Sequence, residues 1–277
     1  MGNIVWLASY PKSGNTWLRM FLLNLFSGSD DPARLNDVSR MSTSDTVMRW
    51  FREVDDRPPK SWSTDDIAHL RLKVQRHLAG LRDDSIFVKT HAALMPMCGQ
   101  PAFDMSVSAG AIYIVRNPLD IVDSYARHAG LDHDETITLM STPGHMLPRT
   151  DDLTEFVQGG WSQNVASWTQ PNPAVHVLRY EDMIEDTEGT FGKVCQYLTL
   201  DVTPEHLSRA VSHSQIAVLR RLEDEDGFHE RTKNQERFFG EGRSGGWRDV
   251  LSDDQVARFV ERHRVQMARF GYVPDGM

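Results

Sequence analysis

Hydrophobic positions near the amino terminus change from a continuous run to a spaced pattern. Ile4–Ala8 is an uninterrupted apolar run, rich in β-branched and aromatic residues, which predicts a short buried strand. From Thr16 onward the apolar residues recur every three or four positions, as on one face of a helix. Pro11, Gly14 and Asn15 separate the two patterns. The chain therefore predicts a strand, a tight loop and a helix, in that order.

The same alternation continues along the chain. Short apolar runs predict three more strands, at Ser85–Val88, Ala111–Val115 and Val175–Leu178. Helical spacing predicts helices from Ser63 to Gly80 and from Ser252 to Gly271, each bounded by a capping residue and a glycine. Further helices are predicted at Thr154–Trp168, after Pro118, and from Thr203 and Ser214 onward. Strands that alternate with helices indicate an α/β fold with a central parallel sheet flanked by helices.

Two stretches lack this regularity. Residues 27–85 combine polar loops, short helical pieces such as Thr43–Arg52 and one long helix. Residues 130–153 show little periodicity and read as an irregular lid or binding loop. We expect one domain over residues 1–277, in which these two stretches are insertions. The first could simply cover an edge of the sheet, or both could line the side of the site where a substrate binds.

Composition narrows the class of protein. The formal charge of the 277 residues is −9, which argues against general binding to nucleic acid or to anionic membranes. Two cysteines provide no disulfide framework, and no apolar run approaches the ~18 residues that span a bilayer. The amino terminus lacks the basic region of a signal peptide. These features predict a cytoplasmic location and no membrane partner.

The first loop has the order of a phosphate-binding site. Backbone N–H groups of a small-residue loop and of the following helix N-terminus can converge on an anion, and Lys12 can add charge. The nucleotide-triphosphate P-loop requires Lys after the last Gly and a hydroxyl residue for Mg²⁺. Here Lys12 precedes Gly14, so the metal-binding half is missing. The alternative is an ordinary strand, turn and helix with one exposed lysine.

The segment PKSGNTW resembles the 5′-phosphosulfate loop of sulfotransferases that use 3′-phosphoadenosine 5′-phosphosulfate (PAPS). The resemblance implies a P-loop-like fold. It also implies that Lys12, Ser13, Gly14, Asn15 and Thr16 hold the 5′ end of the donor. Trp17 would stack against adenine, although its position also suits simple core packing.

Lys89-Thr90-His91 follows the second strand and is similar to the catalytic segment of that family. The carboxyl ends of strands in an open parallel sheet face the ligand. The resemblance makes His91 the base that deprotonates the acceptor hydroxyl. Lys12 would stabilise the leaving group, and Lys89 would neutralise the sulfuryl oxygens.

RNPLDIVDSY follows the third strand and resembles the family motif for the 3′-phosphate, with Arg116 and Ser124 as its ligands. An arginine fork and a hydroxyl suit phosphate oxygens. The structural alternative is an ion pair of Arg116 with Asp120 or Asp123 and an exposed Ser124.

The remaining matches are looser. Tyr180, after the fourth strand, would lie near the nucleotide, and Ser214 would contact adenine. Near the carboxyl end, GEGRSGGW is similar to the segment that closes over the 3′-phosphate, through Gly242 and Arg243. Gly240 and Glu241 replace a basic pair of the family there, and Arg243 is the nearest basic substitute.

Together these segments predict a PAPS-dependent sulfotransferase, similar to bacterial enzymes that act on natural products such as glycopeptides. The reaction would move a sulfuryl group from PAPS to a hydroxyl of a small molecule or natural product and leave adenosine 3′,5′-bisphosphate. No metal site is expected, because the histidines do not match a ligand pattern. A non-catalytic nucleotide-binding protein of the same fold and an atypical Mg²⁺-dependent kinase stay open as alternatives. The acceptor's identity and the oligomeric state stay open as well.

Overall fold

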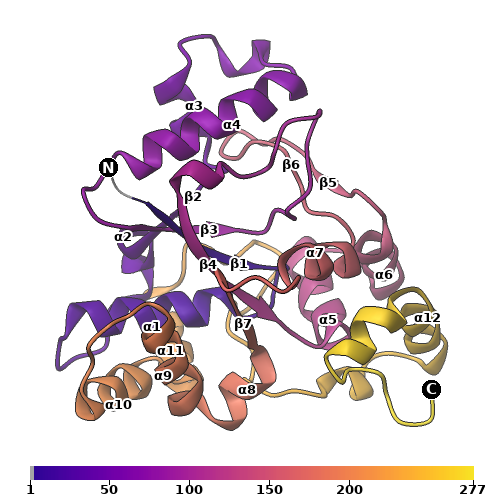
Figure 1. Cartoon of the computed structure of the whole chain (residues 1–277). Coiled ribbons are helices and arrows are strands. Elements are labelled where there is room, and N and C mark those ends of the chain that lie inside the picture. Colours follow the sequence, from indigo (N-terminus) through magenta and orange to yellow (C-terminus); the bar gives the residue numbers. More distant parts are fainter. Residues whose placement is uncertain (1–2) are drawn as a thin grey trace. The chain divides into compact units, whose positions relative to one another are not determined.

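A five-stranded sheet in the order β2-β3-β1-β4-β7 organises the computed structural model, which describes residues 3–277 (Figure 1). The strands are β1 (Ile4–Ser9), β2 (Ser42–Ser44), β3 (Ile86–Thr90), β4 (Ser108–Val115) and β7 (Val175–Arg179). β3 pairs in parallel with β1 on one side and with β2 on the other. In that register Ala8 lies opposite Thr90, so β1 and β3 end together. The predicted parallel sheet is confirmed.

The central position of β1 explains its sequence. All six of its residues are buried, since the strand has neighbours on both edges and side chains packed on both faces. A strand of this kind is apolar throughout and does not alternate with polar residues. This is why a continuous apolar run was a reliable signal for it.

The chain divides into two compact units, and each is described separately. The first unit contains the residues up to Tyr10 together with Ser42–Tyr113 and Met140–Val177. The second unit contains Pro11–Met41, Ile114–Leu139 and Leu178–Met277. The expectation of one domain over residues 1–277, with insertions at 27–85 and 130–153, stays a prediction.

Most of the sheet belongs to the first unit. Its other elements are α3 (Met48–Val54), α4 (Thr64–Ala79), α7 (Trp161–Trp168), the antiparallel pair β5 (Met146–Leu147) and β6 (Phe156–Val157), and the 3₁₀ helices η2 (Pro59–Ser61) and η3 (Met105–Val107). The predicted start of α4 is confirmed, because Ser63 and Asp66 form a capping box there. Helix α4 packs against β1 and against α3 (Figure 1).

The second unit is mainly helical. Its elements are α1 (Asn15–Ser27), η1 (Leu35–Asp37), α2 (Val38–Met41), α5 (Pro118–Ala129), most of α6 (His133–Ser141), α8 (Tyr180–Glu185), α9 (Thr187–Tyr197), α10 (Pro204–His213), α11 (Ile216–Asp226), η4 (Gly246–Asp249) and α12 (Asp253–Arg269). Helix α1 packs against α10, and the rings of Phe21 and Phe191 stack with their centroids 4.1 Å apart. These contacts hold the start of α1, and with it the preceding loop, in a fixed place.

Four local expectations were wrong. The predicted helix Thr154–Trp168 begins only at Trp161, after β6, and the predicted helical piece Thr43–Arg52 begins with strand β2. The stretch 130–153 is not wholly irregular, because it contains α6. Ser214 ends α10 and does not begin α11, which is preceded by Gln215.

No helix within residues 3–277 has both the length and the apolar character that crossing a membrane requires.

Candidate active site

The loop before α1 presents its backbone to an anion. Lys12 and Gly14 both adopt positive φ angles, of 65° and 101°, so the chain turns sharply between β1 and α1. Gly14 is the N-cap of α1 and offers no capping side chain, and the first turn of α1 contains no acidic residue. Backbone N–H groups at a helix N-terminus of this kind can bind a negatively charged group.

Arg116 and Tyr180 surround this loop within the second unit. Arg116 donates from Nη1 to the carbonyl oxygen of Lys12 at 2.8 Å, and its guanidinium lies 4.1 Å from the centre of the Tyr180 ring. The Tyr180 ring also lies against Gly14 and meets Trp17 edge to face. Burial raises the pKa of the Tyr180 phenol, so the ring stays neutral. The structure thus brings Lys12, Gly14, Trp17, Arg116 and Tyr180 together, and their contact with a nucleotide stays a prediction.

Two buried donors of this cluster lack a hydrogen-bond partner among the described residues. They are the hydroxyl of Ser13 and Nε of Arg116. A buried polar group without a partner is costly, and phosphate oxygens would satisfy both. The residues present therefore fit a phosphate-bearing ligand. The indole Nε1 of Trp17 also lacks a hydrogen-bond partner among the described residues. Trp17 is 5% exposed and its ring packs on Phe191, so its surroundings also suit a residue of the core.

The alternative partners for Arg116 are engaged elsewhere. Asp123 pairs with Arg127 and with His133, at 3.3 Å from the latter. Asp120 is buried and accepts hydrogen bonds from the backbone of Gly245 at 2.8 Å and of Trp247 at 3.1 Å. Sequence reasoning did not assign Asp120 this role, because no local pattern links it to a segment more than a hundred positions away.

Asp120 thereby ties the glycine-rich closing segment to the start of α5. Within that segment, Gly242 lies against Ile216 of α11. Arg243 is 59% exposed in its side chain and pairs with Glu241 at 2.9 Å and with Asp249 at 3.2 Å. The predicted 3′-phosphate contact of Arg243 requires the guanidinium to leave these two carboxylates.

The other predicted nucleotide residues have different surroundings. Ser124 is half-buried on α5, two turns after Asn117. The Ser214 side chain is fully buried, and its hydroxyl donates to the carbonyl oxygens of Ala210 and Val211 in its own helix. Thr16 Oγ1 donates to Glu230 at 3.3 Å, and Asn15 is buried at the first position of α1. Their contacts with a nucleotide stay predictions.

The lysine-threonine-histidine segment lies in the first unit, at the end of β3. Lys89 is half-buried on β3, and His91 is the first residue after the end of that strand. Nδ1 of His91 lies 2.8 Å from the carbonyl oxygen of Ser9. Because a carbonyl only accepts hydrogen bonds, Nδ1 carries the proton and Nε2 is the basic nitrogen of the neutral ring.

Helix α7 holds this segment through its backbone. The buried amide of Asn164 donates to the carbonyl of His91 at 3.0 Å, and Asn164 accepts from Tyr113 at 2.8 Å. The indole of Trp168 donates to the carbonyl of Ala92 at 2.9 Å. Sequence reasoning missed Asn164. A polar residue on the inward face of an aromatic-rich helix was the available signal.

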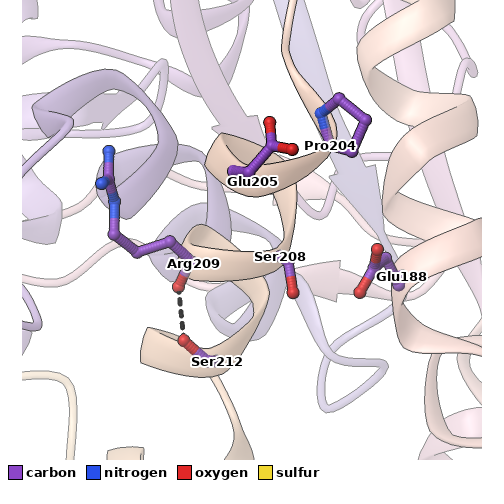
Figure 2. A pocket seen from close by; sticks show the side chains of 6 residues that line it. All are labelled: Glu188, Pro204, Glu205, Ser208, Arg209 and Ser212. Atoms are coloured by element: carbon purple, nitrogen blue, oxygen red, sulfur yellow. Dashed lines mark hydrogen bonds between the residues drawn. The ribbon is translucent and has the colours of Figure 1, made fainter.

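One surface hollow lies apart from these residues in the sequence. Glu188, Pro204, Glu205, Ser208, Arg209 and Ser212 of α9 and α10 line it (Figure 2). None of the six belongs to the predicted site, and the two carboxylates make the hollow unsuited to an anion. Within residues 3–277 there is also no group of three or more His, Cys, Asp or Glu side chains placed to hold a metal ion.

Known proteins are similar to this chain in sequence and in fold. Residues 3–271 match the sulfotransferase domain family. The chain is 25% identical to Sulfotransferase 2A2 of Mus musculus over 98% of this chain and 85% of that protein. It is 24% identical to the 3-alpha-hydroxysteroid sulfotransferase of Cavia porcellus, over 96% and 83% respectively. A solved structure of retinol dehydratase in complex with androsterone and inactive cofactor PAP has the same fold, with a TM-score of 0.64, 19% identity, and coverage of 95% of this chain and 80% of that one.

The family match covers nearly all of the residues that the structure describes, and it includes the phosphate loop, the lysine-threonine-histidine segment and the closing segment. The family and the enzyme class predicted from the sequence motifs are confirmed, and this chain belongs to the sulfotransferase domain family.

Proposed function

We propose that this enzyme transfers a sulfuryl group from PAPS to a hydroxyl group of a small-molecule acceptor. The observation that carries the proposal is the cluster of Lys12, Ser13, Gly14, Arg116 and Tyr180, in which two buried donors await an anion. The similar retinol dehydratase structure contains PAP, the product that PAPS leaves behind, which supports the same donor here.

In the proposed reaction, the acceptor oxygen attacks the sulfur atom of PAPS. The bond between sulfur and the bridging phosphate oxygen breaks, and the products are a sulfate ester and adenosine 3′,5′-bisphosphate. Nε2 of His91 takes the proton of the acceptor hydroxyl. Lys12 neutralises the charge on the leaving oxygen, and Lys89 does the same for the sulfuryl oxygens. Positioning and fixed charges would supply most of the rate.

The tautomer of His91 supports its role as the base. Because Nδ1–H donates to Ser9, the lone pair of the neutral ring resides on Nε2. The hydrogen bond also fixes the ring plane. Asn164 holds the adjacent backbone, so it would act as a positioning residue and not as a catalytic one.

Arg116 and Ser124 are proposed to bind the 3′-phosphate, while Asn15, Thr16 and the loop amides bind the 5′ end. Gly242 and Arg243 would complete the 3′ side after closure, and Trp17, Tyr180 and Ser214 would lie at the adenine. The acceptor class is proposed as a hydroxylated small molecule. The names of similar proteins include hydroxysteroid sulfotransferases, so steroid alcohols are the first compounds to test, followed by phenols and glycopeptide natural products. A cytoplasmic location stays a prediction from the sequence.

Calorimetric titration with adenosine 3′,5′-bisphosphate tests the donor site. We expect binding that survives EDTA and that weakens strongly when AMP, without the 3′-phosphate, replaces the bisphosphate. Preference for ATP with Mg²⁺ would favour the kinase alternative. Tight binding without sulfate transfer to any compound in the acceptor panel would favour a non-catalytic nucleotide-binding protein.

A further inference from the structure

The segment from Phe228 to Phe239, called here the cover segment, lies directly on the phosphate loop and the start of α1. The ring of Phe238 lies 4.2 Å from Nζ of Lys12, a cation-π contact. Near the other end of the segment, Glu230 reaches two residues of α1. All of these residues belong to the second unit.

Glu230 bridges Thr16 and Arg19 through one carboxylate. Oε1 accepts from Nη1 of Arg19 at 2.8 Å, and Oε2 accepts from Oγ1 of Thr16 at 3.3 Å. The Arg19 side chain is only 3% exposed, and that of Glu230 is 18% exposed. Because the first turn of α1 has no acidic residue of its own, Glu230 supplies the negative charge that this helix end favours.

Fixed contacts on both sides bring Glu230 to this position. The carboxylate of Glu223 accepts from the backbone of Phe238 at 2.6 Å and of Phe239 at 3.0 Å. The neighbouring residue His229 donates from its backbone N–H to Asn36 at 3.0 Å. The placement of Glu230 therefore follows from an ordered segment.

A carboxylate and a phosphate use the same donors. An arginine fork and a hydroxyl that hold a carboxylate can hold a phosphate oxygen in the same geometry. Departure of Glu230 removes an anion from a buried guanidinium, which costs free energy that a second anion in the same position would offset. The exchange of one anion for another is the arrangement that satisfies Arg19 in both states.

We infer that Thr16 and Arg19 form an anion subsite that Glu230 fills in the ligand-free enzyme, and that the phosphosulfate end of the donor displaces Glu230. The inference rests on the proposed function and adds Arg19 to its donor-binding residues. It also makes the cover segment a gate, because Glu230 and the donor cannot occupy the subsite together. Phe238 leaves Lys12 in the same movement, which exposes the ammonium group to the leaving oxygen.

The test compares Glu230→Gln with a matched control, Glu236→Gln, in titrations with adenosine 3′,5′-bisphosphate and in thermal unfolding. Glu236 is an exposed glutamate of the same segment, so its variant has the same change in net charge. We expect Glu230→Gln to melt at a lower temperature without ligand, since it loses the pair with Arg19, and yet to bind the bisphosphate more tightly. The gain is about tenfold if Glu230 occupies the subsite about nine-tenths of the time. Glu236→Gln should change neither quantity.

Further variants and probes separate the outcomes. Arg19→Met combined with Glu230→Gln removes both charges, avoids a lone buried ion, and should bind the bisphosphate more weakly than Glu230→Gln alone. If Glu230→Gln lowers affinity or leaves it equal to that of the control, Glu230 is only a structural strut and the inference is overturned. If the wild-type enzyme does not bind the bisphosphate, the donor assignment fails instead. In that case the shift in melting temperature caused by inorganic pyrophosphate tests the anion subsite. A larger shift in Glu230→Gln than in the wild-type enzyme supports the subsite, and an equal shift in the two proteins rules it out.

Discussion

Replacement of Gly14 by alanine provides a quantitative test of the phosphate-loop geometry. Gly14 has a φ of 101°, and an added Cβ would lie 2.7 Å from Cδ2 of Tyr180. The Tyr180 ring has little freedom to withdraw, since it lies between Gly14, the Arg116 guanidinium at 4.1 Å and the edge of Trp17. The alanine therefore introduces both backbone strain and overpacking.

Gly28 separates the two contributions. It also has a positive φ, of 59°, at the other end of α1, but a Cβ there would have no atom within 4 Å. Gly28→Ala should therefore cost only the left-handed backbone strain, about 1–2 kcal/mol. Gly14→Ala should cost at least as much backbone strain, because its φ of 101° lies further from the left-handed minimum, plus about 1–3 kcal/mol for overpacking against Tyr180.

Denaturant unfolding of both variants measures this difference, and calorimetry with adenosine 3′,5′-bisphosphate measures its effect on the site. We expect the free energy of unfolding to be lower in Gly14→Ala than in Gly28→Ala. Affinity for the bisphosphate should fall only in Gly14→Ala, because displaced Tyr180 shifts Arg116. Equal free energies of unfolding and equal affinities in the two variants would refute the argument that the contact with Tyr180 restricts the residue at position 14.

Three other predictions concern single side chains. His91→Ala should lose about 10²- to 10⁴-fold in turnover, the usual contribution of a general base, with bisphosphate affinity retained, and near-normal turnover would contradict its role. Arg116→Ala should weaken binding of the bisphosphate more than binding of AMP, whereas equal losses would remove Arg116 from the 3′-phosphate. Burial, aided by Arg262, lowers the pKa of His263 from 6.5 to about 4. As the pH falls below 6.5, His263 becomes protonated in the unfolded chain but stays neutral in the folded protein. Stability should thus fall by about 2 kcal/mol from this group between pH 7.5 and pH 5. Unfolding curves of His263→Phe should lack this component, and an identical pH dependence in the variant would count against it.

Four strands of the sheet, β1, β3, β4 and β7, were predictable because each contains a short, largely apolar run with a distinct polar end, whereas the short polar strand β2 was missed. β1 is buried along its whole length and has neighbours on both edges, so its sequence is apolar almost without interruption. β3 is apolar only over residues 86–88 and is half-buried at most of its positions. The candidate site residues at the strand ends were proposed from the same pattern. They follow the last apolar position directly, as Arg116 follows Val115.

The errors arose where distant contacts decide the local structure. Phe156 and Val157 fit helical spacing, but they pair with Met146 and Leu147 across the intervening residues 148–155. Gly159 then turns the chain with a φ of 70°. Helix α6 did carry a local signal that was overlooked. Asp132 and Glu135 cap each other's backbone N–H groups, at 2.8 and 3.0 Å, in the pattern of a capping box.

The contacts of Asp120 and Glu230 had no local signal at all. Asp120 binds the backbone of Gly245 and Trp247, and Glu230 binds side chains of α1 about two hundred positions earlier. Neither pairing follows from spacing or composition, because tertiary packing alone brings these segments together.

The hydrogen bond between His91 and Ser9 has a consequence for how freely the sequence can vary. The acceptor is the main-chain oxygen of residue 9, which every amino acid possesses. Where a histidine tautomer is fixed by a partner carboxylate, a single substitution of that partner removes the constraint. The tautomer of His91 is fixed by a main-chain oxygen, so it does not depend on the side chain at position 9 in this way. The Ser9 hydroxyl also lies 3.3 Å from the same nitrogen, but the shorter contact is to the main chain. A library randomised at position 9 should therefore return active enzymes with small side chains that lack a hydroxyl, such as alanine, because a residue that is 1% exposed leaves no room for larger ones.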